Sequence, residues 1–235
     1  MTFNIWLCGT EVDDGLKKIA KHIKIVDPDI VALQEVENQE CFENIQALLG
    51  DDWYSVCRSK VKYPDDAIFT KWPIVLKSVT QTDWALGLKI RVPLTKKSHM
   101  NFTVFGLHLQ YIGYGPYGAC NKMCPTNCYE ELTAGERGEG TAKGVGRVSN
   151  IEQLKRNRLF KQALRLNNSE PLIVMGDFNS PSQLDWISAT KDRHCNIQYR
   201  WPATTNLMSK TGLKDAFRIV HTSPLEQPGY FSLFS

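Results

Sequence analysis

Two stretches of the sequence decide the fold: Asp29-Ile-Val-Ala-Leu-Gln-Glu-Val36 and, far along the chain, Leu172-Ile-Val-Met-Gly-Asp-Phe-Asn-Ser-Pro181. In each, a run of apolar residues leads to an acidic side chain, Glu35 in the first and Asp177 in the second. Short apolar runs of this kind predict buried strands. A carboxylate at the end of a buried strand needs a cation, an arginine or backbone donors to offset its desolvation. We therefore expect the chemistry of this protein at these two strand ends.

The rest of the chain predicts strands and helices around these two stretches. Further strands are expected at 2–7, 53–58, 66–70, 73–81, 87–94 and 100–110. Helices are expected after Asp13 and Asp14 as far as Asp27-Pro28, around Phe42–Leu49 with Gly50 as the cap, and at 149–166, 182–191 and 203–220. A loop is expected at 112–147. This order predicts an α/β protein with stacked sheets and outer helices. The sequence has no linker and no internal repeat, so we expect a single domain over residues 1–235.

The composition excludes several classes of protein. A chain of 235 residues buries enough surface to fold without a disulfide or a structural metal. Lys+Arg 28 against Asp+Glu 25 gives a net charge of +3, well short of a dedicated nucleic-acid binder. The charged fraction of 23% argues against global disorder. No apolar run approaches the ~20 residues of a membrane span.

Seven cysteines, an odd number, leave at least one unpaired in a monomer. Cys120, Cys124 and Cys128 repeat every four residues, but no histidine or fourth cysteine lies near them to complete a tetrahedral metal site. Free or disulfide-bonded thiols are the favoured interpretation. Together with glycosylation patterns at Asn101 and Asn167, the cysteines give a weak preference for secretion, although the chain has no signal peptide. Both ends are expected to lie inside a longer precursor.

Five polar side chains interrupt or end four of the predicted strands. They are Asn4, Glu35, His108, Asp177 and Asn179. Because ligands bind at the carboxyl ends of strands in open α/β folds, these side chains are expected to converge. Carboxylates are the hard oxygen ligands that Mg²⁺ prefers, and Asp177 and Asn179 share one face of an extended segment. The set therefore predicts a metal and phosphate site.

Each of these side chains also has an ordinary structural role. Asn4 suits a strand-end hydrogen bond, Glu35 a salt bridge, His108 a core or rim position, and Asp177 with Asn179 an Asx turn. The remaining histidines are interpreted as solvated surface: His22, His99, His194 and His221. The glycine-rich segment 135–146 lacks the spacing of a phosphate loop or a Rossmann motif and is interpreted as a flexible loop.

Five segments together resemble the endonuclease/exonuclease/phosphatase (DNase I-like) superfamily from residue 2 to about residue 229. They are Thr2-Phe-Asn-Ile-Trp6, Asp29–Val36, Ala67-Ile-Phe-Thr-Lys-Trp-Pro-Ile74, Leu107-His-Leu109 and Gly176-Asp-Phe-Asn-Ser-Pro181. The resemblance implies a four-layer α/β/β/α sandwich of two packed mixed sheets flanked by helices. It also implies hydrolysis of a phosphoester by water, dependent on Mg²⁺ or Mn²⁺. The substrate would be nucleic acid, phospholipid or a small phosphoester.

The resemblance assigns roles to the matching residues. Glu35 is the main metal ligand, with Asp177 beside it. Asp177 also orients or deprotonates the attacking water, and Asn179 supports the phosphate. Asn4 helps to place the metal ligand and the phosphate, and His108 contacts the phosphate. The predicted 149–166 helix adds Gln153 and Arg156, which would support the residues that contact the metal and the phosphate.

The sequence departs from the family at its end. The family closes with an Asp on a late strand and an acid–His pair, but here the last histidine is His221, in Val-His-Thr-Ser-Pro. The last strands are therefore expected to be missing and hydrolysis to be impaired. The alternative is a truncated, non-catalytic relative that binds a phosphorylated ligand or a protein partner. A glycosidase built on Glu35 and Asp177 is a third interpretation, which nothing in the sequence favours.

The sequence does not name the substrate. The inositol-phosphatase signatures are absent. The loop tyrosines Tyr111, Tyr114 and Tyr117 either stack on a base, sugar or lipid chain or fill the interior of their own loop. A monomer is expected.

Overall fold

The computed structural model describes residues 1–120, 128–139 and 145–229, with the backbone alone for 128–131. Contacts divide the chain into two compact units. Unit 1 comprises Met1–His108 and Leu154–Asp177, and unit 2 comprises Leu109–Gln153 and the chain from Phe178 onward. The single domain expected from the sequence stays a prediction. Both sheets belong to unit 1.

Unit 1 contains two four-stranded mixed sheets. The first has the order β1 (Thr2–Asn4), β2 (Ile30–Val36), β4 (Asp65–Thr70) and β3 (Tyr54–Cys57). The second has the order β5 (Ile74–Thr82), β6 (Ala85–Pro93), β7 (His99–His108) and β8 (Leu172–Asp177). β1 runs parallel to β2, and β7 runs parallel to β8, whereas the other neighbours are antiparallel.

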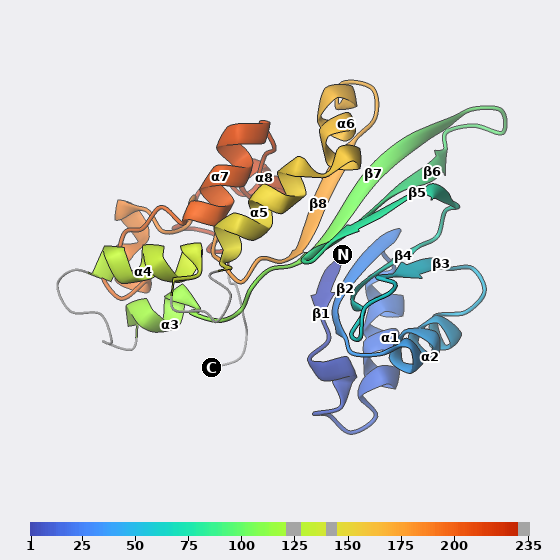
Figure 1. The fold of residues 1–235 in the computed structure, drawn as a ribbon, viewed down its shortest axis with the longest axis horizontal. Helices are drawn as coiled ribbons and strands as arrows, with labels where there is room; N and C mark the ends of the chain where they lie inside the picture. Colours follow the sequence, from blue (N-terminus) through green and yellow to red (C-terminus); the bar gives the residue numbers. More distant parts are fainter. Residues whose placement is uncertain (121–127, 140–144, 230–235) are drawn as a thin grey trace. The chain divides into compact units, whose positions relative to one another are not determined.

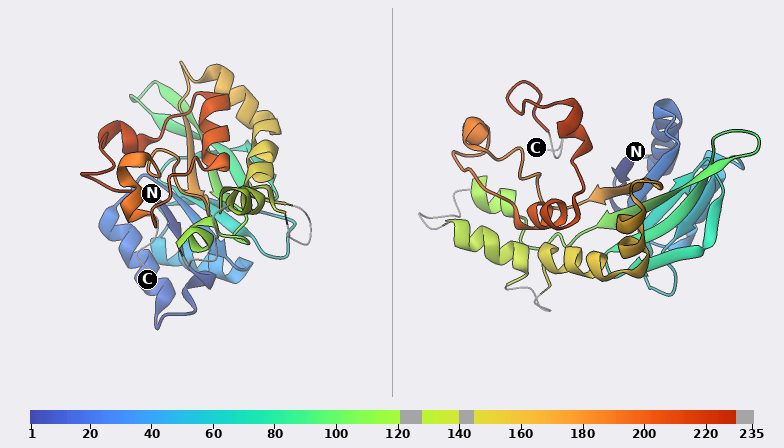
Figure 2. Two further views of the ribbon diagram at one scale, coloured as in Figure 1. Left: turned by 90° about the vertical axis from the view of Figure 1, so that its left-hand side faces the viewer. Right: turned by 90° about the horizontal axis from the view of Figure 1, so that it is seen from above.

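The two sheets pack face to face through apolar side chains. Ala32 and Ile68 of the first sheet meet Leu88 and Val104 of the second in one buried cluster. The opposite face of the first sheet is covered by α1 (Gly15–Val26) and α2 (Gln39–Leu49). On the second sheet, Phe160 of α6 (Arg158–Leu166) meets Phe105 edge to face. With α1 and α6 on opposite sides of the sheets (Figures 1 and 2), the expected four-layer sandwich is confirmed.

The first strand is shorter than expected, because the backbone turns sharply after Asn4. Trp6, Leu7 and Cys8 all have positive φ angles, and Leu7–Gly9 form a short 3-10 turn, η1. Side chains rather than a neighbouring strand accept the turn's first amides: Asn4 Oδ1 accepts from Trp6 and Glu35 Oε2 accepts from Leu7.

Four other expected segments also differ from the structure. The helix expected at 149–166 is two helices, α5 (Arg147–Arg156) and α6, because the Asn157 side chain caps a new helix at Leu159 and Phe160. The loop expected at 112–147 contains α3 (Gly115–Cys120) and α4 (Cys128–Arg137), although 140–144 of the glycine-rich segment lie outside the described residues. Helix 203–220 divides into α7 (Pro202–Thr211) and α8 (Ala216–Val220), because Gly212 ends α7 in a left-handed conformation. In place of the helix expected at 182–191, the structure has the 3-10 helix η2 (Ser188–Arg193), which begins later and ends beyond it.

Unit 2 has an aromatic core. Trp201 is fully buried and contacts Trp186 and Tyr199 edge to face, each with ring centroids 4.8 Å away. His194 stacks on Trp186 at 4.6 Å, so its assignment to the solvated surface was wrong. His221 is half-buried beside Phe217, and that assignment was wrong too. His22 and His99 are exposed as expected.

Each unit has a disulfide of its own. Cys8–Cys41 closes a loop in unit 1, and Cys120–Cys195 closes one in unit 2. Cys120 is therefore not a metal ligand, and Cys124 lies outside the described residues. Within the described ranges, no helix is long and apolar enough to cross a bilayer.

Candidate functional site

Four of the five polar side chains singled out from the sequence meet at one edge of unit 1. Asn4, Glu35, His108 and Asp177 lie at or next to the carboxyl ends of β1, β2, β7 and β8. The register aligns Asn4 with Gln34 in one sheet and His108 with Asp177 in the other. Two parallel strand pairs therefore bring these side chains to the same edge of the packed sheets.

The Asn4 amide joins the two sheets at this edge. Its Nδ2 donates to Glu35 Oε1 at 2.8 Å and to Asp177 Oδ2 at 3.1 Å. Because one nitrogen serves both carboxylates, they lie no farther apart than the sum of these two bonds. Residues that are far apart along the chain are thus brought within reach of one another.

Glu35 is aimed by an irregularity in its strand. The register of β2 against β4 shifts between Leu33 and Val36, and Glu35 has φ 65°. A non-glycine residue in this region of backbone space is uncommon, and a bulge of this kind re-aims a side chain. The bulge turns Glu35 toward Asn4 and toward the amide of Leu7, which donates to Glu35 Oε2 at 2.7 Å.

Sequence reasoning missed Asp65, which completes the site. Its Oδ1 lies 2.8 Å from His108 Nδ1 and accepts the Glu35 amide at 3.3 Å. Burial disfavours protonation of His108, but the hydrogen bond to Asp65 and the charges of Asp65, Asp177 and Asp66 outweigh burial and raise its pKa to about 9. Burial acts to raise the pKa of Asp65, yet the His108 hydrogen bond and charge prevail and lower it. At neutral pH, His108 is therefore an imidazolium.

Asp66 and Arg58 lie behind this pair. Arg58 Nη1 is 3.8 Å from an oxygen of Asp66 and 4.0 Å from one of Asp65. Asp66 is fully buried, and that burial together with the charge of Asp65 raises its pKa well above the ordinary value. The signal for this cluster was visible in the sequence: two adjacent acids stand directly before the apolar run Ala67–Phe69.

The charges at this edge leave room for a cation. Among the groups named here, only Arg58 and His108 carry a positive charge that balances the carboxylates of Glu35, Asp65 and Asp177. Burial first, and then the charges of Asp65 and Glu35, raise the pKa of Glu37. In the part of the chain that the structure describes, the Glu35 carboxylate accepts from two neutral donors, the Asn4 amide and the Leu7 N–H.

The carboxylate oxygens of this site fit Mg²⁺ better than a metal that takes all its ligands from the protein. No three His, Cys, Asp or Glu side chains among the described residues are grouped so as to hold a metal by themselves. Mg²⁺ commonly takes one or two carboxylates and completes its shell with water and substrate oxygens. Glu35 and Asp177 supply such a pair.

The remaining predicted residues are placed differently. Asn179 belongs to unit 2, has φ 46°, and donates from Nδ2 to the Leu109 carbonyl at 2.9 Å. Gln153 also belongs to unit 2, and Arg156 is exposed at the end of α5. The expectation that Gln153 and Arg156 lie on the helix directly before β8 was wrong, because α6 intervenes.

Of the three loop tyrosines, Tyr111 and Tyr117 are exposed and Tyr114 is half-buried. Tyr114 and Tyr117 contact each other edge to face with centroids 5.0 Å apart. Tyr111 is 64% exposed. Tyr117 is 65% exposed in spite of this contact, so packing within the segment accounts for Tyr114 alone.

Comparison with known proteins agrees with this geometry. The model of the Endonuclease/Exonuclease/phosphatase family matches residues 1–222. An uncharacterised protein of Caenorhabditis elegans is 37% identical over 229 residues, which are 97% of this chain and 68% of that protein. The chain also resembles the catalytic domain of human Nocturnin with TM-score 0.51 and 16% identity, covering 89% of this chain and 67% of that one. A mannosyl-6-phosphatase of Bacteroides thetaiotaomicron gives TM-score 0.52 and 15% identity over 92% of this chain and 72% of that one. The chain therefore belongs to the Endonuclease/Exonuclease/phosphatase family.

Proposed function

We propose that this chain hydrolyses a phosphoester with the help of Mg²⁺ or Mn²⁺ bound by Glu35 and Asp177. The observation that supports this most directly is the Asn4 amide, which donates to both carboxylates and holds them together. A bound divalent cation would polarise a phosphoryl oxygen and stabilise the leaving group.

The other side chains of the site divide the remaining work. Asp177 orients the attacking water or takes its proton. His108, held as a cation by Asp65, binds a phosphate oxygen through a charge-assisted hydrogen bond. Asn179 supports the phosphate, a role that rests on its position two residues after Asp177 in the sequence.

A second candidate function follows from the sequence after Asp215. This segment has Glu226 as its only acid and His221 as its only histidine, and Asp215 itself caps α8 and accepts from Ser182. The 235 residues thus lack the acid–His pair with which the family closes, so we expect turnover to be slow. Binding of a phosphorylated ligand or of a protein partner without turnover is the alternative.

The proposed setting is extracellular and monomeric. Two disulfides persist in oxidising compartments and are rare in the cytosol. Substrates within the proposal are nucleic acid, phospholipid and small phosphoesters.

Calorimetric titration with Mg²⁺ and Mn²⁺ tests the metal. We expect a binding heat in the wild type that disappears in Glu35→Gln and in Asp177→Asn, because each variant removes one anionic oxygen ligand. Glu11→Gln, at an exposed acid of unit 1, is the matched control and retains binding. Binding that is unaffected in Glu35→Gln contradicts the proposal.

Hydrolysis of a p-nitrophenyl phosphodiester and of the monoester, each with and without a chelator, tests the reaction. Slow hydrolysis that the chelator abolishes is the expected result. Metal-independent binding of a phosphorylated ligand without hydrolysis favours the second candidate. Hydrolysis of a glycoside that survives chelation would instead favour a glycosidase.

A further inference from the structure

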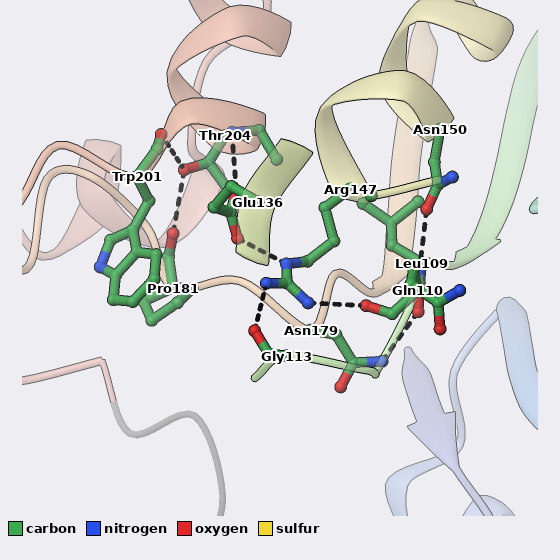
Figure 3. A network of polar contacts seen from close by, with 12 residues as sticks. Leu109, Gln110, Gly113, Glu136, Arg147, Asn150, Asn179, Pro181, Trp201 and Thr204 are labelled. Carbon is green, nitrogen blue, oxygen red and sulfur yellow. Dashed lines mark hydrogen bonds and ion pairs between the residues drawn. The ribbon is translucent and has the colours of Figure 1, made fainter. Parts of the chain in front are cut away.

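Unit 2 contains a charged pair that is completely enclosed. Arg147, the first residue of α5, and Glu136 of α4 both have fully buried side chains, and Arg147 Nε donates to Glu136 Oε1. The second carboxylate oxygen of Glu136 accepts the amide of Ala203, at the start of α7, at 3.0 Å. The pair therefore ties three helices together (Figure 3).

The other donors of Arg147 serve a segment without regular structure. Residues 109–113 follow β7, and their carbonyls have no strand partner. Arg147 Nη1 donates to the carbonyls of Gln110 at 2.9 Å and Ile112 at 3.2 Å, and Nη2 donates to that of Gly113 at 2.8 Å. Buried carbonyls need such partners, and a planar guanidinium can serve several of them in a fixed geometry.

Asn179 binds the same segment. Its Nδ2 donates to the carbonyl of Leu109, while the amide of Gln110 donates to Asn150 Oδ1 at 2.9 Å. Leu109 C=O and Gln110 N–H belong to one planar trans peptide, so they point in opposite directions. Asn179 and Asn150 therefore grip one peptide unit from opposite sides, and Arg147 holds the carbonyl of the next residue (Figure 3).

We infer that Arg147 is a positioning residue: by holding the Gln110 carbonyl it fixes the peptide that sets the direction of the Asn179 side-chain amide. The consequence for catalysis rests on the proposed function, in which Asn179 supports the phosphate. Arg147 itself touches no substrate. Glu136 keeps the guanidinium in place, because its carboxylate accepts from Arg147 Nε, which donates to none of the carbonyls of 109–113.

A direct test observes the Asn179 side-chain amide by ¹H–¹⁵N NMR, with its signals assigned from their absence in Asn179→Asp. Arg147→Lys keeps the charge but cannot place donors on several carbonyls at once. We expect the Asn179 side-chain signals to shift or broaden in Arg147→Lys and to stay in place in Arg200→Lys, a matched change at an exposed arginine of unit 2.

Asn150→Ala is the second variant, and it decides the outcome if Arg147→Lys does not fold. It releases the same peptide from its other side, so we expect it to move the same Asn179 signals. The inference is overturned if the Asn179 signals stay unchanged in Arg147→Lys or, where that variant does not fold, in Asn150→Ala.

Kinetics with the phosphodiester and Mg²⁺ then separate positioning from general damage. We expect Arg147→Lys to lower kcat about tenfold with little change in KM, and to have no further effect in an Asn179→Ala background, because residues that act through one another are not additive. Equal losses with and without Asn179 overturn the catalytic consequence. A wild type that hydrolyses nothing contradicts the proposed function, whereas the Asn179 signals still decide the role of Arg147.

Discussion

Two of the ion pairs in the described residues, one in each unit, are built to opposite plans. Glu136–Arg147 in unit 2 is sealed from solvent, and both carboxylate oxygens and all the carbonyls around the guanidinium are hydrogen-bonded. Asp65–His108 in unit 1 is open at one side, with the Asp65 side chain 26% exposed. Glu35, Asp66 and Asp177 add further acids around it.

The difference separates two uses of buried charge. When every polar atom has a partner inside the protein, as around Arg147, the pair specifies geometry and has nothing left to bind. When acids outnumber cationic side chains at a partly open strand edge, the excess charge is available for an external cation and an anionic substrate.

The largest effect is expected from removing the charge of Glu136. Glu136→Gln leaves Arg147 buried without its anionic partner and should lower the free energy of unfolding by about 3–5 kcal/mol. Asp65→Asn should cost less, on the order of 2 kcal/mol, because His108 can release its proton whereas an arginine keeps its charge. Denaturant titration followed by tryptophan fluorescence measures both. Equal losses would remove the contrast.

The open site depends instead on a close backbone approach at Gly176. This residue has φ 149°, and a Cβ there would lie 2.0 Å from the Leu107 carbonyl oxygen, just before His108 and Asp177. Gly176→Ala should push β8 off β7 and cost about 2–4 kcal/mol together with the loss of Mg²⁺ binding. Gly50→Ala, at φ 103° but in open space, is the matched control and should cost about 1 kcal/mol. A Gly176→Ala protein as stable as the control would contradict the packing of β8.

Of these two ion pairs, the Asp65–His108 pair should make the free energy of unfolding depend on pH. The pKa of His108 is raised to about 9, so its pairing stabilises the fold below the ordinary histidine value near 6.5, and this stability is lost as the pH rises through 9. In metal-free buffer, we expect the free energy of unfolding to fall by on the order of 2 kcal/mol across this window. His108→Asn should flatten the profile. A wild-type profile that is already flat over the same range would show that Asp65 does not hold the proton on His108.

The smallest effect is the stabilisation by metal. At ten times its dissociation constant, Mg²⁺ should raise the free energy of unfolding by about 1.4 kcal/mol. Asp177→Asn should abolish this gain, and Arg200→Lys, outside the proposed site, should keep it. A gain that persists in Asp177→Asn would place the cation elsewhere.

The sequence was sufficient to predict the convergence of four site residues. Apolar runs that end in Glu35 and Asp177 identify the strands β2 and β8, and each pairs in parallel with a neighbour whose carboxyl end lies at the same edge. Asp65 was missed because it begins an antiparallel strand, whose first residue reaches that same edge only once the pairing of β4 with β2 is known. Local patterns do not contain that pairing.

Unit 2 was harder to predict for a different reason. The segment 112–147 has the glycines and tyrosines of a loop, yet tertiary contacts fold α3 and α4 within it. The burial of Arg147 could not be predicted, because nothing in its neighbourhood along the chain shows that four carbonyl and carboxylate groups surround it. Burial of a lone arginine depends on partners that are distant in sequence.

The arrangement of the cysteines affects disulfide exchange while the protein is purified. Of the cysteines whose side chains the structure describes, Cys57 alone is unpaired, and burial raises the pKa of its thiol. Disulfide exchange begins with attack by a thiolate, so a reluctantly ionised Cys57 is a poor initiator of shuffling at neutral pH. Exchange started by Cys57 should therefore be slow during purification at neutral pH and should become appreciable only in alkaline buffer.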